Sequence, residues 1–156
     1  MKVRLLTVSN KQPSWVVDGA QEYARRLPRE WGFEIVECKP EARTAGSSTA
    51  KIQATEAERL RAKLGKGARV VALDERGERW STKDLAGQLG RWQQSGGDVA
   101  LVVGGADGLD AEFLAAAAQR FSLSALTLPH GLVRILVVEQ LYRAVSLQKG
   151  HPYHRG

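Results

Sequence analysis

A glycine-rich string, Gly104–Leu109 (GGADGL), follows an apolar run and precedes a segment with helical character. Glycine in such a place allows positive φ and lets the backbone approach a ligand closely. The string lacks the G-x-G-x-x-G spacing of a dinucleotide-binding loop, and no Gly-Lys-Ser/Thr follows as in a phosphate-binding P-loop. From the residues alone, two interpretations stay open: a cofactor-binding loop and a plain tight turn.

A second candidate segment, Ser124–His130, leads into the last predicted helix. Pro129 lacks a backbone donor and stiffens the exit of this segment. Thr127 and the free backbone groups offer hydrogen bonds to an adenine or a ribose. Taken alone the segment indicates a site only weakly, because a residue such as His130 is more often a capping or packing residue than a catalyst.

The last predicted helix, Gly131–Gln148, carries its few polar residues within one arc. At about 100° per residue, Glu139, Tyr142, Arg143 and Ser146 fall within roughly 100° of one another. Glu139 precedes Arg143 by four residues, which is a favourable orientation for a salt bridge. The pair fits a catalytic group, and it fits a structural ion pair along an interface equally well.

The chain ends on Lys149–Gly156 (KGHPYHRG), which combines cationic side chains with a tyrosine. Such a mixture suits contacts with phosphates and stacking on a nucleobase. His151 and His154 do not predict a metal site, because no other plausible ligands accompany them. By composition alone, a frayed terminus is the ordinary interpretation of such a tail.

The elements that must position these residues follow from hydrophobic periodicity. Strands are predicted over Val3–Val8, Phe33–Cys38, Arg69–Leu73, Val99–Val103 and Leu123–Leu128. Helices are predicted from Ser14 to Pro28 (with Trp15, Gly19, Tyr23 and Leu27 on one face), over Thr49–Leu64, after a Ser81/Asp84 capping box, over Asp110–Ala118 and over Gly131–Gln148. Strands alternating with helices predict an α/β fold with a mainly parallel sheet and helices on both faces. Ligands bind beyond the carboxyl ends of such strands, so the loops after Leu73, Val103 and Leu128 are the candidate sites.

Two helices differ in their polarity. Thr49–Leu64 has a thin apolar stripe and is predicted to be a solvated flank. The last helix is apolar nearly all round, which is typical of a helix that is buried on both sides. In a small domain whose sheet covers one side of it, we expect a second subunit to cover the other.

Length and composition limit the classes of protein to which the chain can belong. The 156 residues are predicted to form a single domain over 1–156. The formal net charge of +6 is a weak indication of an anionic partner, and it fits a soluble protein that happens to be basic equally well. Cys38 is the only cysteine, so an intrachain disulfide is excluded. The sequence shows no leader or membrane-spanning segment, and we expect a cytoplasmic protein.

Several strings together resemble one family. They are Leu73–Asp74, Gly104–Leu109, Leu123–His130, Arg134, Glu139–Ala144 and His151–Arg155. In combination they are highly specific, and they resemble the ribosomal RNA large subunit methyltransferase H family of the SPOUT methyltransferases. The resemblance covers the whole chain, although the stretch 39–66 carries no motif.

The resemblance implies a C-terminal trefoil knot, an exception to the rule that chains do not thread their own loops. It also implies S-adenosyl-L-methionine bound in a bent form within that knot. The cofactor-binding residues that it implies are Leu73, Gly104, Gly105, Ser124, Ala125, Leu126, Thr127, Leu128 and Pro129. These residues belong to the three loops that the strand-end argument selects independently.

The reaction implied by the resemblance is methyl transfer to N3 of a pseudouridine in 23S rRNA on the assembled ribosome. The family acts as a homodimer through the last helix, and methyl transfer of this type needs no metal. The cofactor's sulfonium is already a strong electrophile, so the protein mainly supplies alignment. The N3 proton must leave, which requires a proton acceptor and a cation to stabilise the anionic base.

The tail residues are assigned to these roles. We expect Arg155 and His154 to serve the charge and the proton, and Tyr153 to position the base. The supporting residues on the last helix are Glu139, Tyr142 and Arg143. Two other function classes remain: a non-catalytic ribosome-binding or assembly factor, and a different nucleotide-binding transferase that uses the same glycine loop. Calorimetry with the cofactor tests the first, and competition by adenine nucleotides tests the second.

Overall fold

The computed structural model describes residues 1–155, without the side chain of His154. Its strands are β1 (Val3–Val8), β2 (Glu34–Cys38), β3 (Arg69–Arg79), β4 (Val99–Val103) and β5 (Gln119–Ser122). Its helices are α1 (Ser14–Ala24), α2 (Thr49–Lys63), α3 (Thr82–Ser95), α4 (Ala111–Ala116) and α5 (His130–Gln148), with 3-10 turns η1 (Arg29–Trp31) and η2 (Pro152–Arg155). The sheet order is β2-β1-β4-β3-β5, and each of these neighbouring pairs is parallel. The single-domain α/β prediction is therefore confirmed.

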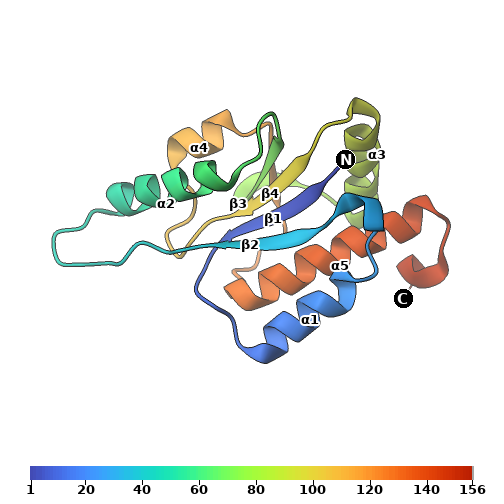
Figure 1. Ribbon diagram of the computed structural model, residues 1–156, viewed down its shortest axis with the longest axis horizontal. Coiled ribbons are helices and arrows are strands. Elements are labelled where there is room, and N and C mark those ends of the chain that lie inside the picture. The colour runs from blue at the N-terminus through green and yellow to red at the C-terminus, as the bar shows by residue number, and fades with distance from the viewer. Residues whose placement is uncertain (156) are drawn as a thin grey trace.

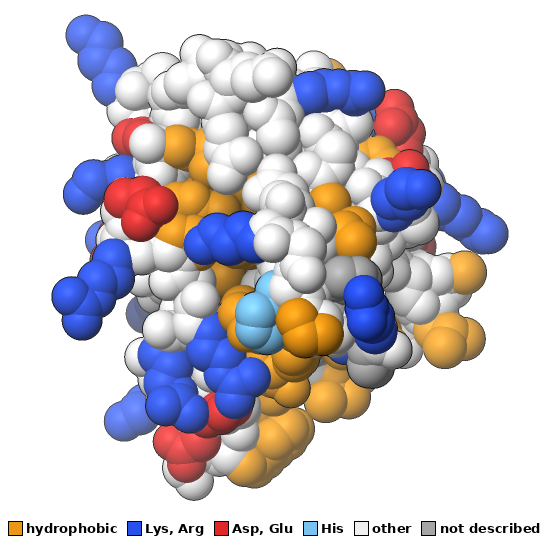
Figure 2. Space-filling model, turned by 90° about the vertical axis from the view of Figure 1, so that its right-hand side faces the viewer, with side chains coloured by type: hydrophobic (Ala, Val, Ile, Leu, Met, Phe, Trp, Pro, Cys, Tyr) orange, Lys and Arg blue, Asp and Glu red, His pale blue; other side chains and the backbone are white. Residues whose placement is uncertain are grey.

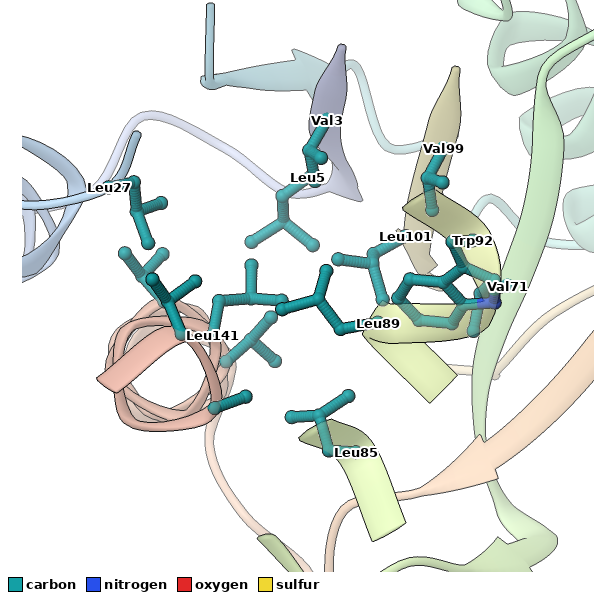
Figure 3. Close-up of a cluster of buried hydrophobic side chains, with 14 of the residues drawn as sticks. Val3, Leu5, Leu27, Val71, Leu85, Leu89, Trp92, Val99, Leu101 and Leu141 are labelled. Atoms are coloured by element: carbon teal, nitrogen blue, oxygen red, sulfur yellow. The ribbon is translucent and has the colours of Figure 1, made fainter. Parts of the chain in front are cut away.

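Helices cover both faces of the sheet, as the sequence predicts. Helices α2 and α4 lie on one face, and α1, α3 and α5 lie on the other (Figure 1). Strand β4 is central and apolar throughout, because its side chains point into the cores of both faces. On the larger core, Leu5 and Leu101 of the sheet meet Leu89 of α3 and Leu141 of α5 (Figure 3).

Helix α5 is the long element of the larger core. It packs between α1 and α3, and Val138, Leu141 and Ala144 are fully buried. Its contact with α1 depends on Gly19, since a Cβ at that position would lie 2.9 Å from Cδ1 of Ile135. Leu132 and Leu136 stay 40% and 38% exposed. The helix is therefore covered by its own chain over most but not all of its surface.

The prediction for the fifth strand is wrong. Strand β5 spans Gln119–Ser122, and the apolar segment 123–128 lies outside the sheet. The reason is local hydrogen bonding, because the Ser124 hydroxyl accepts from the backbone N of Leu126 at 2.9 Å and so offers that backbone a turn instead of a strand. The preceding helix ends at Ala116, since the backbone N of Ala118 donates to Val70 of the sheet.

Two helix predictions need smaller corrections. Helix α1 ends at Ala24, well before Pro28, and it buries Val16 and Ala20 while Trp15 is 58% exposed. Helix α2 is more than a solvated flank, because it buries one face against the sheet; the residues are Ile52, Glu56, Ala57 and Leu60. The predicted capping box is confirmed: Ser81 and Asp84 exchange both hydrogen bonds at the start of α3.

Strand β3 runs further than predicted, and its ladder with β5 is interrupted. Leu73 and Glu78 both pair with Phe121, so the residues between them are left out of the ladder. At Gly77 the chain returns to β5, and a Cβ at Gly77 would lie 2.7 Å from the backbone N of Phe121. The trefoil knot is not tested by these observations and stays a prediction.

This packing predicts a contrast between two glycines. Gly77→Ala should destabilise the protein by roughly 2 kcal/mol or more, because its new methyl group meets the backbone of β5. Gly87→Ala, at an exposed position of α3 with open space around it, should stabilise the protein by about 0.5–1 kcal/mol. Urea unfolding of both variants measures the difference. Equal stabilities would contradict the close approach at Gly77.

Candidate functional site

A pocket of about 610 Å³ opens beside the ladder break within β3 and at the carboxyl ends of β4 and β5. Its size lies within the range of small-molecule sites. It is lined by Gln53, Leu73, Asp74, Glu75, Arg76, Val103, Gly104, Gly105, Ala106, Asp107, Gly108, Leu109, Leu123, Ser124, Leu126, Thr127, Leu128, Pro129, His130 and Val133. All of the predicted cofactor-binding residues except Ala125 are in this set, so the structure brings the three selected loops together.

One wall of the pocket is formed by the β3 residues that the ladder break leaves without partners in β5. Asp74, Glu75 and Arg76 line the pocket, and Arg76 Nε lies 3.6 Å from an Asp74 carboxylate oxygen. These residues follow the buried strand residues Val71 and Ala72. The break therefore turns the end of an ordinary strand into a polar wall of the pocket.

The glycine loop forms a tight hairpin. Gly105 and Gly108 pair across it, and Gly108 has a φ of 80°, which favours glycine. Glycine is required elsewhere by packing: a Cβ at Gly104 would lie 2.8 Å from the backbone carbon of Gly108, and one at Gly105 would lie 2.9 Å from Oε1 of Glu56. At Gly105 a side chain would thus point toward α2. Contacts with the rest of the protein therefore require glycine at these two positions.

Polar contacts from α2 and the preceding loop hold the glycine loop in place. Gln53 Nε2 donates to the backbone O of Asp107 at 2.7 Å, and Arg43 forms an ion pair with the Asp107 carboxylate. The stretch 39–66 carries no sequence motif, yet it supplies both contacts. Its place beside the pocket follows from tertiary structure, which the local sequence does not indicate.

His130 stands where the pocket meets α5. Its Nδ1 lies 3.4 Å from Oγ1 of Thr7, and the ring hydrogen-bonds to the backbone of Gly104. Burial lowers the pKa of His130, the Gly104 contact opposes this, and nearby Arg134 lowers the pKa further. The neutral imidazole is thus favoured, and it ties the start of α5 to β1 and to the glycine loop.

One turn further along α5, Arg134 is buried at 5% exposure. Its Nη2 donates to Ser9 Oγ at 2.8 Å and to Glu37 Oε2 at 2.9 Å. A buried guanidinium needs such partners, because an unpaired one costs several kcal/mol. Together with His130, Arg134 fixes the first turns of α5 on the ends of β1 and β2.

The predicted catalytic residues gather in a second cluster at the other end of α5. Arg143 Nε lies 2.7 Å from a Glu139 oxygen, which confirms the predicted salt bridge. The Tyr153 ring lies 4.6 Å from the Tyr142 ring and 5.0 Å from the Arg143 guanidinium carbon. Burial and a hydrogen bond with Tyr23 raise the pKa of Tyr153 to about 12. The tail is therefore packed against α5 and α1 through the ring of Tyr153.

Arg155 is the other predicted catalytic residue of the tail whose side chain the structure describes. Arg155 lies in η2 and is exposed, and the side chain of His154 is outside the described residues. Figure 2 shows the face at this end of the molecule, where Lys and Arg side chains stand around exposed hydrophobic ones and acidic side chains are fewer. Such a surface suits an anionic partner.

The two clusters are far apart within one chain. Helix α5 begins at the pocket with His130, and Tyr142 lies more than three turns along it, which is about 18 Å of helix. None of the catalytic candidates that the structure describes lines the pocket. The structure brings together the members of each predicted set, but it does not bring the two sets to one another.

Sequence reasoning missed several residues of both clusters. Asp107 and His130 belong to motifs named in the sequence analysis but were not assigned to the site. Gln53, Glu56 and Tyr23 belong to no motif.

No helix among the described residues is long and apolar enough to cross a membrane. Among those same residues, no group of three or more His, Cys, Asp or Glu side chains is placed to hold a metal ion.

Comparisons with known proteins identify relatives over the whole chain. Residues 1–154 match the family model described as predicted SPOUT methyltransferase. The chain is 53% identical over 155 residues to a ribosomal RNA large subunit methyltransferase H from Nitrosospira multiformis, and 52% identical to one from Burkholderia multivorans, with 99% of each chain covered. Relatives with this name cover the full length, so the resemblance seen in the sequence is confirmed.

Solved structures show the same fold at low sequence identity. A probable methyltransferase from Bordetella pertussis superposes with a TM-score of 0.61 at 19% identity, covering 92% of this chain and 96% of that one. A probable methylase family protein from Haemophilus influenzae gives a TM-score of 0.57 at 13% identity, covering 97% of this chain and 69% of that one.

The environment of His130 predicts a pH dependence of stability. Because its pKa is lowered from 6.5, the folded state binds fewer protons than the unfolded state at slightly acidic pH. The free energy of unfolding should therefore fall as the pH drops below about 6.5. His130→Asn, whose amide keeps hydrogen-bonding groups, should lose part of this fall. Denaturant unfolding at pH 7.5 and 5.5 measures it, and equal falls in both proteins would show that His130 does not contribute.

Proposed function

The chain belongs to the SPOUT methyltransferase family, and from this premise we propose that it methylates large-subunit ribosomal RNA. The methyl donor is S-adenosyl-L-methionine, and the acceptor is N3 of a pseudouridine in 23S rRNA of the assembled ribosome in the cytoplasm. The observation that carries the proposal is the pocket at the strand ends, which collects eight of the nine expected cofactor-binding residues. No metal takes part in the proposed reaction.

The lining of the pocket fits S-adenosyl-L-methionine in chemistry as well as in size. Leu73, Leu126 and Pro129 offer apolar surface to the adenine, while the backbones of the glycine loop and of the segment 124–129 offer hydrogen bonds. Asp74 and Asp107 place negative charge near a ligand that carries a positive sulfonium. The cofactor when bound supplies an electrophilic methyl group, so the residues of the protein need mainly to align the acceptor.

The acceptor base requires groups that the pocket lacks. The N3 proton must be removed, and the anionic base then needs a cation nearby. We assign these roles to His154 and Arg155, and we assign Tyr153 to stacking on the base. Glu139 holds Arg143, which faces the ring of Tyr153 together with Tyr142, so these three residues position the tail.

The separation along α5 means that a single chain does not complete this site. We propose that a second copy of the chain supplies the tail to the pocket. In a two-fold dimer with antiparallel α5 helices, the carboxyl end of one α5 lies beside the start of the other. The pocket begins at His130 and the tail follows Gln148, so this arrangement brings the two clusters together.

Exposed apolar residues support the homodimer. Leu132 and Leu136 of α5 are 40% and 38% exposed, and Trp15 of the neighbouring helix α1 is exposed more than either. Large apolar side chains that are exposed on neighbouring helices often mark a surface that another protein chain covers. A second α5 would cover the side of the helix that the sheet leaves open, as its all-round apolar sequence predicts.

The proposed function is tested by transfer of a labelled methyl group. Whole ribosomes, isolated 50S subunits and free 23S rRNA are incubated with the protein and labelled S-adenosyl-L-methionine. We expect label in 23S rRNA of whole ribosomes. The labelled nucleotide should be a pseudouridine whose N3 no longer reacts with chemical reagents, because it already carries the methyl group. No transfer to any of the three substrates, from protein that binds the cofactor, would contradict the proposal.

The tail should be required for transfer and dispensable for binding. Deletion of residues 151–156 should abolish methylation of ribosomes, while the calorimetric affinity for S-adenosyl-L-methionine changes less than threefold, because no tail residue that the structure describes lines the pocket. Arg155→Ala should lower the methylation rate at least about tenfold, which corresponds to roughly 1.4 kcal/mol of transition-state stabilisation. Lys66→Ala, at an exposed position away from the tail, serves as the control. A truncated protein that methylates at the normal rate would make the tail a frayed terminus.

The dimer should depend on the exposed side of α5. Leu136→Arg places an unpaired charge in the proposed apolar contact, which costs roughly 3–5 kcal/mol, and should shift the mass measured by light scattering from two subunits to one. Glu58→Arg, on the exposed side of α2 across the sheet, should leave the dimer intact. A wild-type mass of one subunit at micromolar concentration would contradict the proposed dimer.

A further inference from the structure

Glu56 is a buried carboxylate directly behind the glycine loop. It lies on α2, is 5% exposed, and packs close to Gly104 and Gly105 with no space for a water molecule between them. A Cβ at Gly105 would lie 2.9 Å and 3.1 Å from the two Glu56 oxygens, so the carboxylate packs against the backbone of this residue. Gly105 also lines the main pocket. Only the thickness of the loop backbone therefore separates Glu56 from the proposed cofactor site.

The charge of Glu56 has little compensation in the protein. Oε2 accepts from the backbone N of Glu41 at 3.0 Å, but Oε1 has no hydrogen-bond donor within residues 1–155. The salt bridges found among these residues do not include Glu56, whereas Asp107 is paired with Arg43. His130 is nearby, but its burial favours the neutral imidazole. A buried and unpaired carboxylate is costly.

We infer that Glu56 makes the pocket selective for the cationic cofactor over the neutral product of the reaction. The inference rests on the proposed function. S-adenosyl-L-methionine carries a positive sulfonium; when its methyl group forms a bond to N3, the sulfur keeps the electron pair of the broken bond and becomes a neutral thioether, and N3 releases its proton. A fixed negative charge behind a thin loop attracts the sulfonium and not the thioether.

This selectivity favours exchange of product for cofactor after each turnover. The two ligands share adenosine and the amino acid end, so contacts to those parts bind both alike. Charge at the sulfur is the feature that differs most, and an uncompensated carboxylate recognises it without contacting either ligand. Asp74 and Asp107 line the pocket, but each is partly neutralised by an arginine (Arg76 and Arg43), so these two carboxylates discriminate less.

A purely structural role gives a different expectation. Glu56 also ties the loop before α2 to the glycine loop through the backbone N of Glu41. Loss of that tether would loosen the pocket for both ligands equally. The ratio of the two affinities therefore separates the charge from the tether.

The experiment uses Glu56→Gln, which keeps the shape and one acceptor but removes the charge. Calorimetry gives the Kd of the full-length protein for S-adenosyl-L-methionine and for S-adenosylhomocysteine. We expect Glu56→Gln to raise the first Kd about fivefold or more and the second less than twofold. Glu58→Gln, an exposed position on the same helix, should leave both Kd values unchanged. Circular dichroism confirms the fold of each variant.

If Glu56→Gln does not fold, Glu56→Leu is used, since an apolar residue of similar size removes the buried charge. Leucine also removes the acceptor for the backbone N of Glu41, so for this variant the ratio of the two Kd values is compared, and it should change about threefold or more. Equal weakening of both ligands, or no change in either, would overturn the inference and leave the proposed function intact. A wild-type protein that binds neither ligand would instead contradict the proposed function.

Discussion

Helix α5 is a rigid rod whose first turn is fixed at the pocket, and this constraint governs the rest of the molecule. His130 and Arg134 bind its start to the ends of β1 and β2, and its apolar side fills the core between α1 and α3. Since a helix rises about 1.5 Å per residue, the tail must emerge far from the pocket of its own chain. The proposed cofactor site and the proposed base-recognition tail therefore lie at opposite ends of the subunit, and the proposed dimer would bring them together.

The pocket itself depends on backbone segments that pack very close to one another. The break in the β3–β5 ladder frees three polar residues to form one wall, and it requires Gly77 because a side chain would meet β5. The glycine loop packs so closely on itself and on Glu56 that Gly104 and Gly105 have no room for a Cβ. Because this loop is only one backbone thick, the proposed effect of the Glu56 charge on a bound ligand needs no direct contact between the two.

Much of this was predictable from the sequence, because periodicity and strand-end loops depend on local pattern. The parallel sheet, the capping box at Ser81 and the meeting of three loops at one edge all follow from such patterns. The fifth strand did not, since Ser124 takes up the backbone in a local turn that apolar content alone does not show. Glu56, Gln53 and Tyr23 were also missed, because their roles come from contacts between residues distant in the chain.

The central claim is that the pocket of one subunit works with the tail of the other, and mixed dimers test it most directly. Gly105→Val, which has no room beside Glu56, is mixed in equal amounts with the protein lacking residues 151–156. Each is inactive alone, and a mixed dimer carries one intact composite site out of two. Methylation of ribosomes should return to about a quarter of the wild-type rate, because half of randomly formed dimers are mixed. Continued inactivity, with mixed dimers demonstrated by mass, would contradict the account.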